Sequence, residues 1–75
     1  MNRAFVFLNT EVDATNFVYE NLKSVPGITE VFRIYGSYDV ALRIEATDVN
    51  ALKEIVTNKI RKSEGVRSTV TLLII

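Results

Sequence analysis

The two halves of this chain resemble each other, and this internal repeat limits the possible folds more than any other feature. The segment Leu22–Ile28 corresponds to Ile60–Val66 at a constant offset of 38 residues, and each segment has a glycine directly before its last apolar residue. In both halves, this segment lies where an amphipathic helical pattern gives way to a strand pattern. The sequence therefore predicts one strand–helix–strand unit that occurs twice.

Four segments have the patterns of strands. Ala4–Leu8 is short and continuously apolar, which is typical of a strand buried on both faces. Ile28–Tyr35 and Tyr38–Glu45 alternate apolar and polar residues, and Val66–Ile75 is a long closing strand. In the second of these segments, the alternation predicts that one face carries Ile28, Glu30, Phe32 and Ile34.

Two helices are predicted between these strands. Asp13 is the expected N-cap of the first helix, whose apolar residues recur at spacings of three and four until Pro26 and Gly27 end it. Thr47-Asp48 opens the second helix, which extends to Ile60 and has cations in its last turn.

The predicted order is therefore strand–helix–strand, followed by strand–helix–strand. Right-handed crossovers in both halves give a four-stranded antiparallel sheet with both helices on one face. This is the α+β, ferredoxin-like βαββαβ fold. At 75 residues, the chain is expected to form a single domain, residues 1–75.

Two helices cover only one face of such a sheet, yet the first and last strands are apolar on both faces. Residues 5–8 and 72–75 contain no polar side chain. An exposed apolar patch of this size marks an association site, and an uncovered strand without charge or proline is prone to aggregate. We expect a two-fold dimer whose free sheet faces pack together, the dimeric α/β-barrel type of association.

The composition argues against several classes of function. There is no cysteine and no histidine, so thiolate sites and the commonest general base and metal ligand are missing. Nine basic residues balance nine acidic ones, which gives no field to attract nucleic acid or anionic lipid. We expect no metal, no cofactor, no enzyme activity, no direct contact with nucleic acid or membrane, and a cytoplasmic location.

The turn between the two central strand patterns carries the densest group of polar functional residues. Gly36 suits the positive φ of a tight reversal, and Ser37 and Asp39 suit turn positions. The turn, residues 35–39, also contains Tyr35 and Tyr38, which supply two phenol groups. This hairpin tip is therefore a candidate site for a small polar ligand.

Three motifs together resemble a known regulatory module. They are Leu22-Lys23-x-x-Pro26-Gly27-Ile28-x-x-Val31-Phe32-Arg33, Tyr35-Gly36-Ser37-Tyr38-Asp39-Val40-x-Leu42-Arg43 and Gly65-Val66-x-x-Thr69-x-Thr71. The resemblance is to the effector-binding RAM domain (regulation of amino-acid metabolism) of the Lrp/AsnC, or feast/famine, transcription regulators. It extends from about Ala4 to Ile74.

Family members with regulatory activity usually carry an N-terminal helix-turn-helix domain, and this chain has none. It is either a stand-alone RAM domain or an excised fragment, and Met1 followed at once by the first strand favours the stand-alone protein. Without a recognition helix, the resemblance implies action on partner regulators, including mixed assembly with full-length relatives, rather than direct DNA binding.

The resemblance also implies that dimers assemble into higher rings and bind an amino-acid effector where dimers meet. The matching ligand-binding residues are Gly36, Ser37, Tyr38 and Asp39 in the hairpin and Thr69 and Thr71 in the last strand. In such a site, Asp39 would accept the ligand ammonium, the amides around Gly36 and Ser37 would bind its carboxylate, and the threonines would add hydroxyl contacts.

Each of these residues also has a structural interpretation. Asp39 suits a cap on a hairpin N–H, Thr69 and Thr71 suit a strand, and Tyr38 suits an interface. Arg43 is expected to form an ion pair on a strand face that it shares with Asp39 and Glu45. Two functions remain open: an amino-acid sensor that also oligomerises, and a purely structural oligomerisation module without a ligand.

Overall fold

The structure is a computed structural model that describes every residue from 1 to 75. Its elements follow the predicted order, except that the second helix continues directly into a π-helical segment, η1. Neither helix has the length and apolar character that crossing a bilayer requires. The elements are β1 Asn2–Thr10, α1 Thr15–Leu22, β2 Ile28–Arg33, β3 Val40–Ala46, α2 Val49–Glu54, η1 Ile55–Ile60 and β4 Val66–Ile74.

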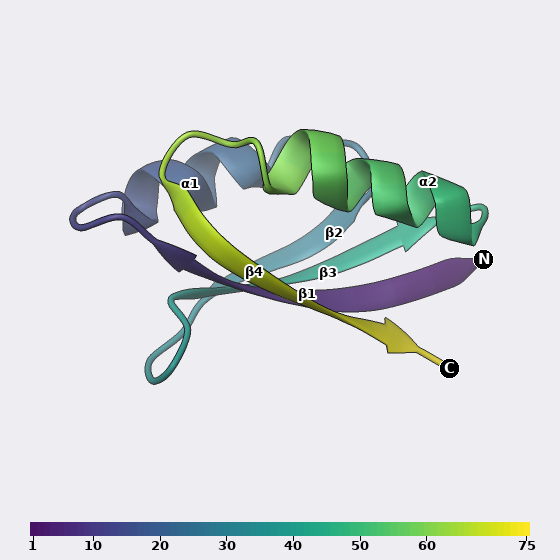
Figure 1. Cartoon of the computed structure of the whole chain (residues 1–75), viewed down its shortest axis with the longest axis horizontal. Helices are drawn as coiled ribbons and strands as arrows, with labels where there is room; N and C mark the ends of the chain where they lie inside the picture. The colour runs from purple at the N-terminus through teal and green to yellow at the C-terminus, as the bar shows by residue number, and fades with distance from the viewer.

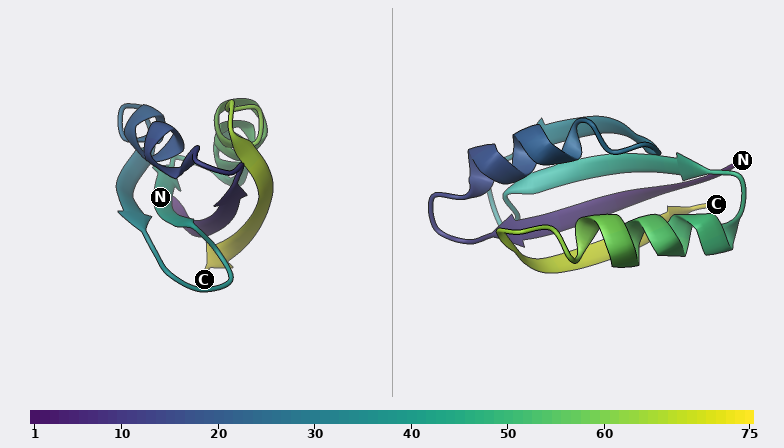
Figure 2. Two further views of the ribbon diagram at one scale, coloured as in Figure 1. Left: turned by 90° about the vertical axis from the view of Figure 1, so that its left-hand side faces the viewer. Right: turned by 90° about the horizontal axis from the view of Figure 1, so that it is seen from above.

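The four strands form one antiparallel sheet in the order β2-β3-β1-β4. Both helices lie on the same face of this sheet (Figure 1). In the end-on view of Figure 2, α1 lies above the β2 side of the curved sheet and α2 above the β4 side. The ferredoxin-like βαββαβ prediction is confirmed.

The core lies between the helices and the two central strands, β1 and β3. The alternation of each strand sends every second side chain towards the helices, and these side chains are buried. They meet the inward-facing side chains of both helices. The core consists of Ala4, Val6, Leu8, Val18, Leu22, Val40, Leu42, Ile44, Leu52 and Ile60.

The two helices begin in different ways. Asp48 caps α2 as predicted, because its Oδ1 accepts a hydrogen bond from the Ala51 N–H at 2.8 Å. The prediction that Asp13 caps α1 is wrong. Asp13 has a φ of 63°, and Ala14, which has no side-chain cap, precedes the first helical residue. The chain reverses tightly here, with the Ala14 N–H bonded to the Glu11 carbonyl at 3.0 Å, and aspartate tolerates the left-handed conformation that this reversal needs.

Strand β2 does not keep the alternation predicted for it. Ile28 pairs with Ile44, whereas Glu30 pairs with Arg43, so the register shifts between Ile28 and Glu30. As a result, Ile28 and Val31 both pack against the core. The prediction that Ile28 shares a face with Glu30 is wrong, because a bulge adds one residue to β2 and reverses the alternation.

The sheet surface opposite the helices, called the free face below, is rich in apolar side chains. On this face, Phe5 of the central strand β1 pairs with Leu72 of the edge strand β4, and the two residues are 41% and 53% exposed. In Figure 1, no element covers this side of the sheet. The apolar side chains of the free face are Phe5, Phe7, Phe32, Val70, Leu72 and Ile74.

Two glycines with positive φ give a prediction about stability. Gly27 has a φ of 95°, and a Cβ placed there would lie 2.5 Å from Ile55 Cδ1, whereas Gly36, with a φ of 128°, has open space around it. Both Gly→Ala changes add backbone strain, but only Gly27→Ala also forces a helix side chain to move. We expect Gly27→Ala to cost about 1–2 kcal/mol more than Gly36→Ala in urea unfolding. Equal losses of unfolding free energy in the two variants would show that the Ile55 side chain moves aside at no measurable cost.

Candidate functional site

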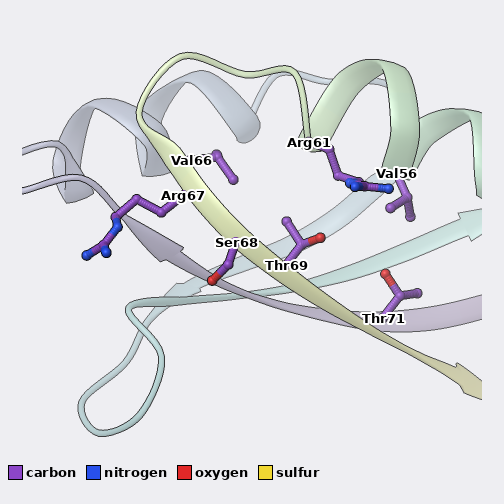
Figure 3. Close-up of a pocket in the computed structure, with 7 residues that line it drawn as sticks. All are labelled: Val56, Arg61, Val66, Arg67, Ser68, Thr69 and Thr71. Carbon is purple, nitrogen blue, oxygen red and sulfur yellow. The ribbon is translucent and has the colours of Figure 1, made fainter.

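A groove runs between strand β4 and the second helix, on the helix side of the sheet. Its polar part is a cavity of about 570 Å³. In Figure 3, Thr69 and Thr71 point from β4 towards the helix, and the Arg61 side chain extends towards Val56 above the two threonines. The cavity is lined by Val56, Arg61, Val66, Arg67, Ser68, Thr69 and Thr71.

The strand alternation places the two threonines on the same side of β4. Thr69 pairs with Leu8 and Thr71 with Val6, and both partners are core residues on the helix side of β1. Ser68 pairs with Asn9 and lies on the free face, where the Asn9 side-chain amide is 3.5 Å from its hydroxyl. Thr69 and Thr71 therefore line the groove together.

The opposite wall of the groove comes from the π-helical segment. The Arg61 N–H donates to the Val56 carbonyl at 2.8 Å, which is an i to i+5 bond. Such a bond brings Val56 and Arg61 to the same side of the helix, and both line the cavity. Single π-helical turns are frequently found at functional sites.

The polar cavity carries an uncompensated positive charge. Two arginines line it and no carboxylate does. The ion pairs of the structure join Glu20 to Lys23 and Arg43 to Glu30 and Glu45, so neither Arg61 nor Arg67 is paired. An anionic ligand is the chemical match for such a cavity.

A second cavity of about 270 Å³ continues the groove along β4. It shares Val56 and Thr71 with the first cavity, and most of its other lining residues are apolar. The groove thus has one polar, cationic part and one apolar part. The second cavity is lined by Ala4, Val49, Leu52, Lys53, Val56, Thr71 and Leu73.

The carboxylate of Asp39 joins the end of the hairpin to strand β1. Asp39 Oδ2 accepts hydrogen bonds from the Thr10 N–H at 2.8 Å and the Thr10 hydroxyl at 3.2 Å. The Thr15 hydroxyl is 2.8 Å from the Thr10 hydroxyl, whose single proton is already donated, so Thr15 is the donor. Asp39 therefore caps a backbone N–H, as the structural interpretation predicts, but the N–H belongs to β1 and not to the hairpin.

The rest of the hairpin extends away from the groove. In Figure 1, the loop between β2 and β3 hangs below the sheet, on the side opposite the helices. Gly36 and Ser37 are exposed at this loop, and Gly36 has the predicted positive φ. The Tyr38 ring packs against Phe7 of the free face in a tilted arrangement, with ring centroids 5.8 Å apart.

The structure therefore divides the six predicted site residues into two groups. Thr69 and Thr71 lie in the groove on the helix side, whereas Gly36 and Ser37 project from the other side, with Tyr38 on the free face. Asp39 lies between them, bonded to β1. Within one chain, these groups do not form a single pocket.

Arg61 and Val56 are site residues that the sequence did not predict. A cation in the last turn of a helix is accounted for by the helix dipole, and nothing in the local sequence predicts a π-helical turn. The ion pair predicted for Arg43 is confirmed with Glu45 at 3.6 Å, and Arg43 also pairs with Glu30 at 3.3 Å. Asp39 has no part in this pairing, because its side chain bonds Thr10 instead.

Comparison with known proteins decides the family. Residues 3–75 match the family described as the Lrp/AsnC ligand binding domain. The chain belongs to this family. The crystal structure of FFRP-DM1 is 31% identical, with each chain covered completely and a TM-score of 0.96. The transcriptional regulator NMB0573 of Neisseria meningitidis, solved as a complex with L-Met, has the same fold at 21% identity, with a TM-score of 0.89 over 99% of this chain and 49% of that one.

The chain also resembles part of an enzyme. The homocitrate synthase of Sulfurisphaera tokodaii is 43% identical over 61 residues, which is 81% of this chain and 13% of the synthase. The chain thus spans about an eighth of the length of the curated relatives that it matches. The shared part corresponds to a ligand-binding domain of the type found in Lrp/AsnC regulators.

Proposed function

We propose that this Lrp/AsnC ligand-binding domain is an amino-acid sensor that binds its effector between subunits and passes its state to partner regulators. The hairpin of one chain, with Gly36, Ser37, Tyr38 and Asp39, and the groove of another, with Thr69 and Thr71, would form the site. The observation that carries this proposal is that Gly36, Ser37 and Tyr38 lie on the opposite side of the sheet from Thr69 and Thr71, with Asp39 between the two groups. A ligand that contacts both groups needs two chains.

The free face supports the assembly that such a site requires. Its large apolar side chains Phe5, Phe32, Val70 and Leu72 are exposed. A second chain packed against this face would cover them. We propose a two-fold dimer through the free faces that assembles further into rings.

The hairpin is placed to take part in contacts between chains. It projects beyond the free face (Figure 2), and Gly36 and Ser37 are exposed, with no backbone hydrogen bond from either N–H. Asp39 Oδ2 is bonded to Thr10, but Oδ1 accepts no hydrogen bond within the chain. This oxygen would accept the ligand ammonium. The L-Met complex of the Neisseria regulator makes free amino acids the first ligands to test.

We expect a mixture of the twenty amino acids to raise the unfolding temperature and to change or sharpen the oligomer in light scattering coupled to size exclusion. Ligand that binds only the assembled state stabilises it by mass action. Splitting the mixture then identifies the effector. We expect Thr71→Val to weaken its binding by at least about tenfold, because a hydroxyl contact is lost without loss of volume.

The matched control is Thr57→Val, which makes the same change at an exposed position of η1 outside both cavities. Equal binding by both variants would remove Thr71 from the site. A stable oligomer that responds to no amino acid in either measurement would contradict the sensor and favour the structural oligomerisation module.

A further inference from the structure

We propose that the groove beside β4 binds a small carboxylate with a short apolar tail, and that Arg61 binds the carboxylate. This inference rests on the proposed function, since it names the chemistry of the same ligand. It departs from the sequence-based expectation that the hairpin amides bind the carboxylate. The departure follows from the charges and shape of the groove.

The first step is the charge. Arg61 and Arg67 both line the polar cavity and neither is paired with a carboxylate. In Figure 3, the two side chains have different directions: Arg61 lies over the groove, whereas Arg67 points away from it. Arg61 is thus the cation that a bound anion would meet, and a planar guanidinium matches a carboxylate in a bidentate arrangement.

The second step is the set of hydroxyl donors facing Arg61. Thr69 and Thr71 point towards the same space from β4, and no intramolecular hydrogen bond occupies either hydroxyl. A carboxylate on Arg61 can accept from these hydroxyls, which would satisfy its remaining lone pairs. The π-helical bond between Arg61 and Val56 holds the guanidinium on this side of the helix.

The third step is the continuation of the groove. Beyond Val56 and Thr71, the walls become apolar, with Leu52 and Leu73 in the second cavity. A ligand with its carboxylate on Arg61 would place a short apolar tail there. Aliphatic and thioether side chains have this character, and burial of each methylene would contribute to affinity.

The fourth step concerns the ammonium. The cations Arg61, Arg67 and Lys53 line the two cavities, and no carboxylate does. Nothing in the groove therefore selects an amino acid over the 2-oxo acid with the same side chain. The two ligands share the anion and the tail, so any preference for the ammonium must come from the hairpin of another chain.

Titration calorimetry on the full chain tests this inference with L-methionine, its 2-oxo acid and L-methioninamide. Methioninamide keeps the ammonium and the side chain but lacks the anion. We expect it to bind at least about tenfold more weakly than L-methionine, and a preference for L-methionine over the 2-oxo acid then measures what the hairpin of another chain contributes. We expect Arg61→Gln to weaken both carboxylates by at least about tenfold and to leave methioninamide unchanged.

Lys62→Gln is the matched control, because it removes one positive charge from an exposed residue that follows Arg61 but lines neither cavity, and it should change binding by less than about twofold. Amide-proton NMR spectra of both variants report that the fold is kept and whether the ligand shifts Thr69 and Thr71. Methioninamide binding as tightly as methionine, or Arg61→Gln binding like the wild type, would overturn the inference. In that case, a weaker binding of L-methionine by Thr71→Val would still support the proposed function. If the wild type bound neither L-methionine nor its 2-oxo acid, both this inference and the proposed function would be refuted.

Discussion

Replacing Leu42 by alanine is expected to remove about 2–5 kcal/mol from the free energy of unfolding. Leu42 is completely buried in β3, where it pairs with Val6 on one side and Val31 on the other. Truncation to alanine leaves a cavity that β1 and β2 cannot close, because backbone hydrogen bonds hold both strands to β3. Domains of 75 residues have about 4–11 kcal/mol of stability, so this one change removes a large share.

The matched control is Leu73→Ala, the same truncation at a position 56% exposed on the edge strand β4. We expect it to cost less than about 1 kcal/mol. Urea unfolding of both variants at a series of chain concentrations measures the two losses and separates folding from assembly. A small loss for Leu42→Ala would mean that the core is not organised around β3 as the structure shows.

A charge among the apolar side chains of the free face is expected to abolish the proposed dimer. Leu72→Glu would place a carboxylate beside Phe5, and burying it without a partner would raise the dissociation constant by at least about 100-fold. Size exclusion with light scattering should then give the mass of one 8.5 kDa chain. Because Leu72 is 53% exposed in the single chain, the fold itself should tolerate the change.

Leu73→Glu is the control for this experiment. It adds the same charge one residue further along β4, at nearly the same exposure, but on the helix side of the sheet. We expect it to keep the dimer through the free faces. If both variants assembled like the wild type, the free face would not be the interface, and a monomeric wild type would refute the dimer directly.

The parts of the fold that were predictable are those set by short-range patterns. The continuous apolar run of β1, the period-two alternation of β3 and the three-and-four spacing of the helices depend only on neighbouring residues. The same alternation correctly placed Thr69 and Thr71 on one face. The repeat supplied the topology, because two right-handed strand–helix–strand units leave few ways to form one sheet.

The errors lie where a distant segment decides the local conformation. Asp13 suits an N-cap by composition, but the reversal after β1 requires a left-handed residue there. The bulge in β2 depends on its pairing with β3, and a single added residue exchanges the two faces. Asp39 was placed with Arg43 and Glu45 from strand parity, yet its carboxylate bonds the Thr10 N–H.

The sequence by itself determined the order of the elements, the glycine turns, the apolar free face and the residue types available for a ligand. Only the tertiary structure decided which of those residues meet. Arg61 faces Thr69 and Thr71 because the π-helical turn and the edge strand β4 pack side by side. In the sequence, these three residues are far less conspicuous than the hairpin. The same packing sends the hairpin to the opposite side of the sheet. Such placements depend on long-range pairing and helix packing, which no local pattern encodes.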